Sequence, residues 1–347
     1  MPDLANWPSV TILIPARNEE QKIEEALHSV QALDYPDLEI IILDDRSTDG
    51  TAAIVERVAA GDARIRVLHI EELPPGWLGK NHALQLGSEI ARGEFLLFTD
   101  ADVVFEPSTL RRSVTVMERD GLDHLAAGFF IRTPSLLVDL FVATFSYFFI
   151  LYVRPWGISD PGSSSHIGIG GFNLVRADLY RKAGGHQPIA MRPDDDIKLG
   201  KLLKKNGARQ RLADSEGLLQ VEWYSSLPEL IDGLMKNGFS GVEYSLPLLV
   251  GATVAQLILS VWPFVAVFVT HGVVRWENVA ISIVTLMLVA IMARKNGGRA
   301  GYSLAFPFCT LLFLFILWRS AFLALRHGGI RWRETFYPLS ELRANRL

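Results

Sequence analysis

The sequence predicts a doubly wound α/β sheet followed by membrane-spanning helices, and three observations point to this fold class. Short apolar, β-branched runs alternate with helical patterns through the N-terminal half, which is typical of a parallel sheet. Polar and acidic residues directly follow three of these runs. After Leu246 the chain contains long stretches without charge, of the length that a bilayer crossing requires.

The expected elements alternate in the order that a doubly wound sheet requires. Apolar residues recur at helical spacing between the predicted strands, and a turn at Pro74–Gly76 precedes the third helix. We expect strands over Val10–Ile14, Leu38–Leu43, Ile65–Ile70 and from Phe95, with helices over Ile23–Leu33, around Ile54–Val58 and over Gly79–Ala91.

Composition excludes several classes of protein. The 347 residues carry 34 basic and 38 acidic side chains, so nothing marks the chain as a nucleic-acid binder. The only cysteine, Cys309, excludes disulfides and cysteine-ligated metal sites. Met1–Pro8 has neither the basic region nor the apolar core of a secretory signal. We therefore expect the N-terminal half to stay in the cytoplasm.

Acidic and polar residues follow three predicted strands: Arg17-Asn-Glu19, Asp44-Asp45 and Asp100-Ala-Asp102. The carboxyl ends of parallel strands meet at one edge, where open α/β sheets bind their ligands. Two carboxylates separated by one residue can reach one hard cation, Mg²⁺ or Mn²⁺, together with substrate phosphates. The alternative is that Asp100 and Asp102 only begin a turn before Pro107.

Two glycine patterns fail as nucleotide motifs. Gly76-Trp-Leu-Gly79-Lys80 lacks the spacing and the Ser/Thr of a P-loop. Gly168-Ile-Gly170-Gly171-Phe-Asn173 has Asn where a dinucleotide fingerprint needs its last glycine, and it lies far from the first βα turn. A nucleoside triphosphatase and a dehydrogenase are therefore unsupported.

Four motifs together resemble the inverting glycosyltransferase family 2, whose fold is called GT-A. Over about Val10–Leu218 they occur in the family's order and spacing: Pro15-Ala-Arg-Asn-Glu-Glu20, Asp44-Asp-Arg-Ser-Thr-Asp-Gly-Thr51, Gly79-Lys80 with Ala83-Leu84, and Thr99-Asp-Ala-Asp102. The resemblance implies a UDP- or GDP-sugar donor and a bound Mg²⁺ or Mn²⁺.

The resemblance also implies roles for residues around the donor. It places Pro15, Arg17, Glu19 and Asp45 at the nucleoside, Lys80 near the diphosphate, Asp100 and Ala101 near the nucleotide-sugar, and Asp102, with Asp100, at the metal. In the simpler alternatives, Lys80 is an ordinary solvated lysine at a helix start, and Arg17 only forms an ion pair with Asp44.

The segment Pro193-Asp194-Asp195-Asp196 resembles the place where the family positions its general base. Direct displacement at the anomeric carbon needs one carboxylate to accept the acceptor's hydroxyl proton. We rank Asp196 first and Asp195 second, and expect Asp194 to be a helix cap. The alternatives are that all three acids complement the helix dipole, or that His166 or His186 is the base.

One departure from the family pattern concerns the product. Processive synthases of the family carry Gln-x-x-Arg-Trp after the base, whereas this chain reads Val221-Glu-Trp-Tyr-Ser-Ser226. Transfer of a single sugar is therefore favoured over a polysaccharide synthase. A non-catalytic membrane scaffold could retain the same fold, and a sugar-nucleotide pyrophosphorylase would share the sheet but would not need the membrane helices.

The uncharged runs predict three membrane helices, at about 246–270, 278–293 and 302–325, after a cytoplasmic catalytic domain over 1–240. Arg294, Lys295 and Arg299 agree with a cytoplasmic loop. The basic tail over 326–347 disagrees, because three crossings place it outside; alternatively, the short middle segment is re-entrant.

Leu136–Val153 is an apolar, aromatic-rich segment with one charge, Asp139. We expect a helix that lies in the membrane interface or is buried in the core. A catalytic domain at the bilayer implies a lipid or lipid-linked acceptor, and the arrangement resembles glycosyltransferases that act on carotenoid, hopanoid, ceramide or polyprenyl-phosphate acceptors.

Overall fold

The computed structural model describes Leu4, residues 6–215 and residues 217–347, and these form two compact units. Unit 1 contains the described residues up to Phe130, together with Val153–Glu222 and Leu347. Unit 2 contains Ile131–Tyr152 and Trp223–Arg346.

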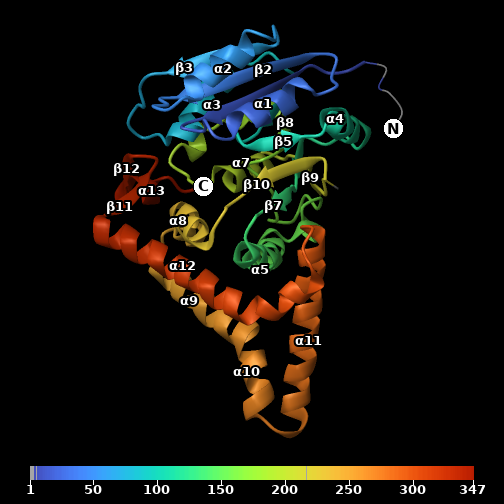
Figure 1. Cartoon of the computed structure of the whole chain (residues 1–347), viewed down its shortest axis with the longest axis vertical. Helices are drawn as coiled ribbons and strands as arrows, with labels where there is room; N and C mark the ends of the chain where they lie inside the picture. Colours follow the sequence, from blue (N-terminus) through green and yellow to red (C-terminus); the bar gives the residue numbers. More distant parts are fainter. Residues whose placement is uncertain (1–3, 5, 216) are drawn as a thin grey trace. The chain divides into compact units, whose positions relative to one another are not determined.

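Unit 1 is an α/β unit in which strands and helices alternate along the chain (Figure 1). Its strands are β1 (Val10–Ala16), β2 (Leu38–Asp45), β3 (Ile65–Ile70), β4 (Phe95–Phe98), β5 (Val103–Phe105), β6 (His124–Ala127), β8 (Asn173–Arg176), β9 (Gln210–Ala213) and β10 (Leu219–Glu222). Its α-helices are α1 (Ile23–Gln31), α2 (Thr51–Ala59), α3 (Gly79–Ile90), α4 (Thr109–Arg119), α6 (Ala177–Lys182) and α7 (Asp195–Lys205), and its 3-10 turns are η1 (Pro155–Gly157) and η2 (Gln187–Ile189). The strand β7 (Phe130–Arg132) lies at the boundary between the units.

The central sheet has seven strands in the order β3-β2-β1-β4-β8-β6-β9. The predicted parallel pairing is confirmed over β3, β2, β1 and β4. The sheet as a whole is mixed, because β8 runs antiparallel to both β4 and β6. A long stretch of chain, rather than a single helix, separates β4 from β8. The strand–helix–strand pattern that predicts parallel pairing is therefore missing there.

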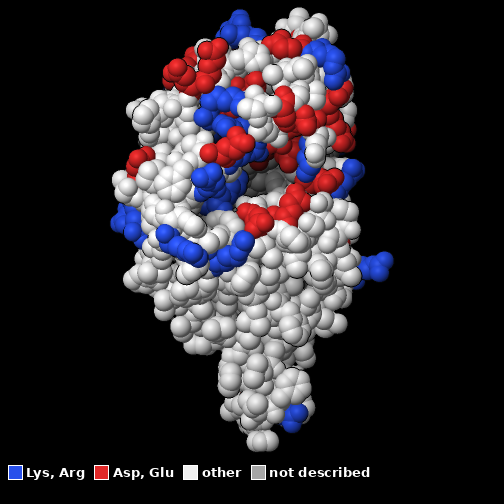
Figure 2. All heavy atoms as spheres, turned by 60° about the vertical axis from the view of Figure 1, so that its left-hand side comes forward, with Lys and Arg blue, Asp and Glu red and all other residues white. Residues whose placement is uncertain are grey.

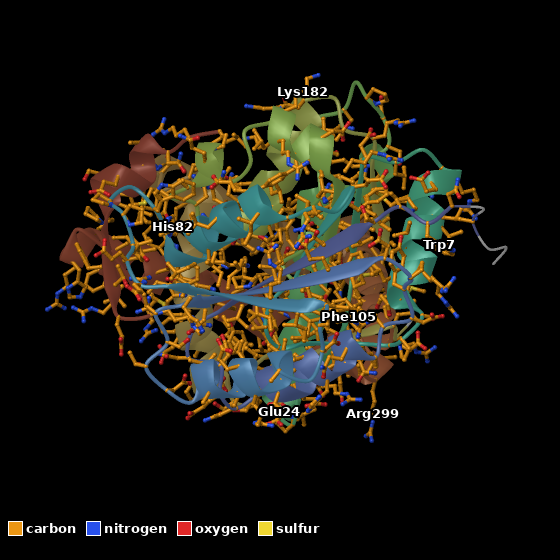
Figure 3. The ribbon with its side chains drawn as sticks, turned by 90° about the horizontal axis from the view of Figure 1, so that it is seen from above. Trp7, Glu24, His82, Phe105, Lys182 and Arg299 are labelled. Carbon is orange, nitrogen blue, oxygen red and sulfur yellow. The ribbon has the colours of Figure 1, made fainter. Side chains whose placement is uncertain are left out.

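Helices cover both faces of the sheet, and the strand sequences explain why. Successive side chains of a strand point to opposite faces, so Ile12 and Ile14 pack with α1 and α2 while Leu13 packs with α3, α6 and α7. In Figure 3, Glu24 of α1 and His82 of α3 lie on opposite sides of the strands. Burial on both faces accounts for the near-continuous apolar strands of the sequence.

Unit 2 is mainly helical. Its elements are α5 (Leu136–Val153, all but its last residue), α8 (Leu227–Gly238), η3 (Ser240–Val242), α9 (Leu246–Gln256), the π-helical η4 (Leu257–Val261), α10 (Trp262–Val269), α11 (Gly272–Lys295), η5 (Ala300–Ala305), α12 (Phe306–His327), β11 (Gly329–Trp332), β12 (Thr335–Pro338) and α13 (Leu339–Ala344).

Four segments of the described chain are long and apolar enough to cross a membrane: 136–157, 246–269, 272–295 and 300–327. The helix α11 is longer than the expected 278–293, because it also contains Arg275 and Glu277 near its start and two basic residues in its last turn. The expected helix over 246–270 is interrupted by η4, just before Pro263. Proline lacks the backbone N–H that an α-helix uses, which explains the local π-helical turn.

The surface of α9, α10 and α11 is strongly apolar. From Leu246 to Ala293 the only charged residues are Arg275 and Glu277, and Figure 2 shows the part formed by α10 and α11 as almost free of charge. Large apolar side chains are exposed along it, Phe268 to 81%. Exposed apolar area of this extent is typical of a surface that contacts a membrane or another protein.

The segment Leu136–Val153 is helical, as expected. Phe141 and Phe148 are buried, whereas Leu137 and Tyr152, near its two ends, are exposed. Both expected environments, membrane interface and protein core, stay predictions.

Candidate active site

Three predicted polar segments lie at one edge of the sheet. They follow β1, β2 and β4, which are neighbouring parallel strands, and Ala16 of β1 pairs in register with Asp44 of β2. These strand ends therefore share one edge, and the prediction is confirmed.

The loops after β1 and β2 bind each other through reciprocal hydrogen bonds. The Thr48 N–H donates to Asn18 Oδ1 at 2.8 Å, and in the other direction the Glu19 N–H donates to Thr51 Oγ1 at 2.8 Å. Asn18 and Arg46 adopt left-handed φ values of 54° and 57°, which are uncommon for residues other than glycine. Hydrogen bonds in both directions hold this double loop in one conformation.

Asp45 is buried and bound by arginine. Arg46 donates from Nε to Oδ1 at 2.7 Å and from Nη2 to Oδ2 at 3.0 Å, and Arg17 Nη1 lies 3.7 Å from Oδ2. The alternative in which Arg17 pairs with Asp44 is wrong, because Asp44 faces His69 instead. A Cβ at Gly79 would overlap the Asp45 carboxylate, so only glycine lets α3 begin this close.

Asp44, His69 and Glu56 form a separate polar group. His69 Nδ1 lies 2.9 Å from Asp44 Oδ2, and its Nε2 lies 2.7 Å from Glu56 Oε1. The hydrogen bond to Glu56, then that to Asp44, raises the pKa of His69. Protonated His69 therefore ties β3 to the end of β2 and to α2.

We expect His69 to make stability depend on pH. A histidine whose pKa is raised by folding stabilises the fold fully below its unfolded pKa of about 6.5, and this contribution is lost as pH rises through the folded value. Melting temperatures measured from pH 6 upward should fall more in the parent protein than in His69→Gln. Glu56→Gln, which removes the larger cause, should give an intermediate slope, and equal slopes in all three would contradict the assignment.

Lys80 is not the solvated lysine of the simpler alternative. Its Nζ lies 2.8 Å from Asp100 Oδ1 and 3.2 Å from Asp195 Oδ2. Burial alone lowers the pKa of Lys80, but the carboxylates of Asp100, Asp195 and Asp196 outweigh it, and the net pKa is raised. Lys80 stays charged and joins the end of β4 to the start of α7.

Asp196 is held by two backbone donors. The Gly170 N–H donates to Oδ2 at 2.9 Å, and the Ile197 N–H donates to Oδ1 at 2.8 Å. Burial and the neighbouring Asp195 carboxylate raise its pKa. A Cβ at Gly170 would lie 2.7 Å from Asp100 Oδ2 and 3.6 Å from Asp196 Oδ2. The two carboxylates from distant parts of the chain therefore border the same glycine.

Two glycines allow the segment before Gly170 to lie directly on α7. A Cβ at Gly168 would overlap the Asp196 carbonyl, and a Cβ at Gly200 would overlap the Ile167 carbonyl. This glycine-rich segment does not have the spacing of a dinucleotide motif. Its glycines instead permit a close backbone contact that positions Asp196.

We expect Gly200→Ala to destabilise unit 1 strongly. The added methyl group meets backbone rather than a flexible side chain, so the cost should be at least the 1–3 kcal/mol, roughly, of overpacking. Gly61→Ala is the matched control, because its Cβ would meet only the Val58 carbonyl at 3.5 Å. Urea unfolding of both variants measures the difference, and equal stability would contradict the contact.

Asp102 is partly buried, and the carboxylates of Asp100 and Glu19 lie near it. Burial, followed by the charges of Asp100 and Glu19, raises its pKa to about 7. Carboxylate oxygens are hard ligands, and their negative charges repel one another. A divalent cation such as Mg²⁺ would neutralise this repulsion. Within the described part of the chain, no three His, Cys, Asp or Glu side chains converge to hold a metal alone. A cation here therefore needs further oxygen ligands, as Mg²⁺ commonly takes from substrate phosphates.

Asp194 was expected to cap α7 and does not do so. It occupies the N-cap position, but its carboxylate makes no capping hydrogen bond. Instead Arg192 donates to it from Nε and Nη2, both at 2.9 Å, and Lys198 Nζ lies 3.6 Å away. Arg192 is 1% exposed. A buried ion pair thus fixes the turn that leads into Asp195 and Asp196.

Asn81, like Arg192, was not singled out from the sequence. Its Nδ2 donates to the carbonyls of Ile189, Ala190 and Arg192 at 2.9–3.1 Å. It therefore ties the segment before α7 to the start of α3, beside Lys80. No local pattern signals this contact, because its partners lie more than one hundred positions away.

The two histidine alternatives for the base differ in environment. His186 is 1% exposed, its Nδ1 lies 2.6 Å from the Tyr180 hydroxyl, and burial lowers its pKa to about 3. Burial also lowers the pKa of His166, whose Nδ1 donates to the Ser164 carbonyl at 2.9 Å. His186 is therefore a neutral side chain in contact with Tyr180.

The predicted residues of β4, α3 and α7 meet at a small pocket. It is lined by Lys80, Thr99, Gly170, His186, Asp195 and Asp196, among others. The end of β4, the start of α3 and the start of α7 therefore converge, as the hypothesis of one active site requires. Lys80 joins the carboxylates of Asp100 and Asp195.

The fold is that of the GT-A glycosyltransferases. The structure matches that of a mannosyltransferase from Pyrobaculum calidifontis, solved in complex with GDP-Man and Mn²⁺, with a TM-score of 0.57 and 19% sequence identity over 93% of this chain and 88% of that chain. Residues 11–182 match the model of glycosyl transferase family 2. These residues form a glycosyl transferase family 2 domain, and relatives of the chain are named glycosyltransferases.

Relatives of known name come from Staphylococcus aureus. The chain is 26% identical over 239 residues to the 4,4'-diaponeurosporenoate glycosyltransferase of strain bovine RF122 / ET3-1, covering 69% of this chain and 60% of that relative. It is 22% identical over 348 residues to the enzyme of the same name from strain MRSA252, covering 97% of this chain and 90% of the relative.

Proposed function

We propose that this glycosyltransferase moves one sugar from a UDP- or GDP-sugar to a lipid or lipid-linked acceptor at a membrane, with inversion at the anomeric carbon. The observation that carries the proposal is the convergence of Lys80, Asp100 and Asp196 at the carboxyl edge of the sheet. The same chain carries four helices apolar enough to enter a bilayer.

The double loop after β1 and β2 supports a nucleoside site. Its hydrogen bonds hold the Glu19 backbone in place, and Arg17 lies beside Asp45. In the proposal Pro15, Arg17 and Glu19 bind the nucleoside together with Asp45. A buried carboxylate flanked by arginines offers both an acceptor and donors to a base edge. In the proposal Asp45 faces the base, where the incoming base competes with Arg46 for its oxygens.

Lys80 and the cation-side carboxylates support a diphosphate site. A nucleoside diphosphate leaves easily only when its negative charge is neutralised, and Lys80 supplies a fixed positive charge. Asp102, with Asp100, would hold a Mg²⁺ or Mn²⁺ ion, and Ala101 lies between them. The ion, when bound, neutralises charge on the leaving diphosphate.

In the proposal, Asp196 is the general base. The acceptor's hydroxyl oxygen attacks the anomeric carbon from the side opposite the leaving group and forms the new C–O bond. The bond between that carbon and the diphosphate oxygen breaks, and its electron pair leaves with the diphosphate. The hydroxyl proton goes to an Asp196 oxygen, while Lys80 keeps Asp195 ionised and oriented.

The acceptor and the location are argued from the apolar surface. The Staphylococcus aureus relatives are named 4,4'-diaponeurosporenoate glycosyltransferase, and the exposed apolar helices here would bring the enzyme to lipids. We propose a multi-pass protein of the cell membrane whose catalytic unit faces the cytoplasm, the side that supplies nucleotide-sugars.

The proposal is tested by incubating membranes that contain the protein with labelled UDP- and GDP-sugars and Mn²⁺ or Mg²⁺. Label should appear in the lipid extract with the parent protein and be absent with Asp196→Asn. Label in a polymeric product would instead support the processive alternative. Absence of label from lipid and polymer with every donor would overturn the proposed function.

A further inference from the structure

The helix α12 is mainly apolar and has two different faces. One face is buried within unit 2 and includes the small residues Ser320, Ala321 and Ala324. The other face is exposed, and its large side chains recur at spacings of three and four residues. They are Phe308, Leu311, Phe315, Trp318, Phe322 and Leu325. The apolar stripe thus runs along almost the whole helix.

The covered face of α12 is packed by α8, which carries charges. Ser320 Oγ donates to the Met235 carbonyl at 2.6 Å and accepts from the Phe239 N–H at 3.0 Å. Arg319 Nη1 forms an ion pair with Asp232 of α8 at 2.8 Å, and the Asp232 side chain is 69% exposed. If α12 crossed the bilayer, this solvent-exposed pair would lie in hydrocarbon, where exposed charges are strongly disfavoured.

The hairpin β11–β12 continues from α12 and is also two-faced. Ile330 and Tyr337 pair across the strands and are buried, whereas the next pair, Arg331 and Phe336, is exposed. Arg333, at the turn, is exposed as well. Aromatic and basic side chains on one surface at the end of an apolar helix are typical of contact with anionic lipid headgroups.

Basic residues lie near both ends of α12. Arg294, Lys295 and Arg299 precede it, Arg326 lies in its last turn, and Arg331 follows it. The helices α10 and α11 pack against each other and run to a common tip, while in Figure 1 α12 runs obliquely across the open end of this pair. A crossing by α12 would put the two basic groups on opposite sides of the membrane, against the positive-inside rule.

We propose that α12 lies in the plane of the membrane interface and that its apolar stripe, with the Arg331–Phe336 face of the hairpin, binds an anionic phospholipid bilayer. The chain after Leu246 then crosses the membrane only twice, through α9–α10 and through α11. Both basic groups lie on the same, cytoplasmic side. The inference rests on the proposed membrane attachment and resolves the conflict over the basic tail that three crossings create.

Single-cysteine labelling tests the topology in the full-length protein. In a Cys309→Ser parent, H271C marks the tip between α10 and α11, G301C marks η5 just before α12, and S340C marks the segment after the hairpin. A membrane-impermeant maleimide is applied to inside-out and right-side-out vesicles. G301C and S340C should label from the same side and H271C from the opposite side. Labelling of S340C from the side of H271C would overturn the proposal.

The lipid contact has its own readout. Hydrogen exchange over 329–338 should be slower in vesicles of phosphatidylcholine with phosphatidylglycerol than in phosphatidylcholine alone, and the double variant R331Q/R333Q should lose this difference. Arg112→Gln, an exposed arginine of α4, is the matched control and should keep it. Equal exchange in both lipids would refute binding to anionic headgroups. Sugar transfer is assayed on the same vesicles, so failure of catalysis and failure of this topology are distinguishable.

Discussion

Replacing Asp196 by Asn is expected to lower the rate of sugar transfer by about 10²–10⁴-fold, the usual contribution of a positioned general base. Asn keeps the size of the side chain but cannot accept the acceptor's proton. It also keeps only one oxygen for the two N–H donors of Gly170 and Ile197. We therefore expect a loss of stability of about 1–2 kcal/mol from one unmade hydrogen bond, which leaves the protein folded.

The measurement is the initial rate of transfer to lipid, together with the melting temperature of each variant. Asp178→Asn is the matched control, because Asp178 is exposed on α6 and accepts only from the Leu179 N–H. Asp195→Asn separates the two candidates for the base. Loss of transfer in Asp195→Asn together with full activity in Asp196→Asn would move the base to Asp195. Full activity in both would retire the general-base assignment.

The sequence was most informative about the parallel core. The runs Leu38–Leu43 and Ile65–Ile70 were expected as strands, and β2 and β3 contain or match them. This succeeds because strands buried on both faces must be apolar throughout. The antiparallel β8 was not predicted, because its four residues carry no signal of the direction in which they pair.

The residues of the candidate site could be predicted from the sequence, but the contacts between them could not. Asp100, Asp195 and Lys80 could each be named from motifs, yet the ion pairs that join them depend on tertiary structure alone. Asp194 was misassigned for the same reason. An acidic residue before a helix is usually a cap, and only the fold shows that buried Arg192 binds it.

The membrane half shows where local patterns stop being sufficient. Hydropathy identifies α9, α11 and α12 as candidate spans alike, because it counts composition and length. Mean hydropathy does not report the contacts of α12 with the charged helix α8. The direction of each face of a helix, rather than its mean hydropathy, separates a helix that crosses from one that lies in the interface.

Replacing Asp102 by Asn is expected to abolish metal-dependent transfer and to uncouple nucleotide binding from the metal. In the parent protein, Mn²⁺ should strengthen the binding of UDP or GDP measured by calorimetry, because an ion held by Asp102 would neutralise charge on the diphosphate. A tenfold gain corresponds to about 1.4 kcal/mol. Asp102→Asn should bind the nucleotide equally with and without Mn²⁺, since the neutral amide is a poor ligand for a hard cation.

Chelation gives the same test without a substitution. Treatment with EDTA should stop transfer by the parent protein, and added Mn²⁺ or Mg²⁺ should restore it, whereas Asp102→Asn should respond to neither. Asp178→Asn again serves as the control and should behave like the parent. Transfer that persists in EDTA would refute divalent assistance altogether. A metal-dependent gain in nucleotide binding that survives in Asp102→Asn would instead move the ligand role to Asp100 or Glu19, the carboxylates that crowd Asp102.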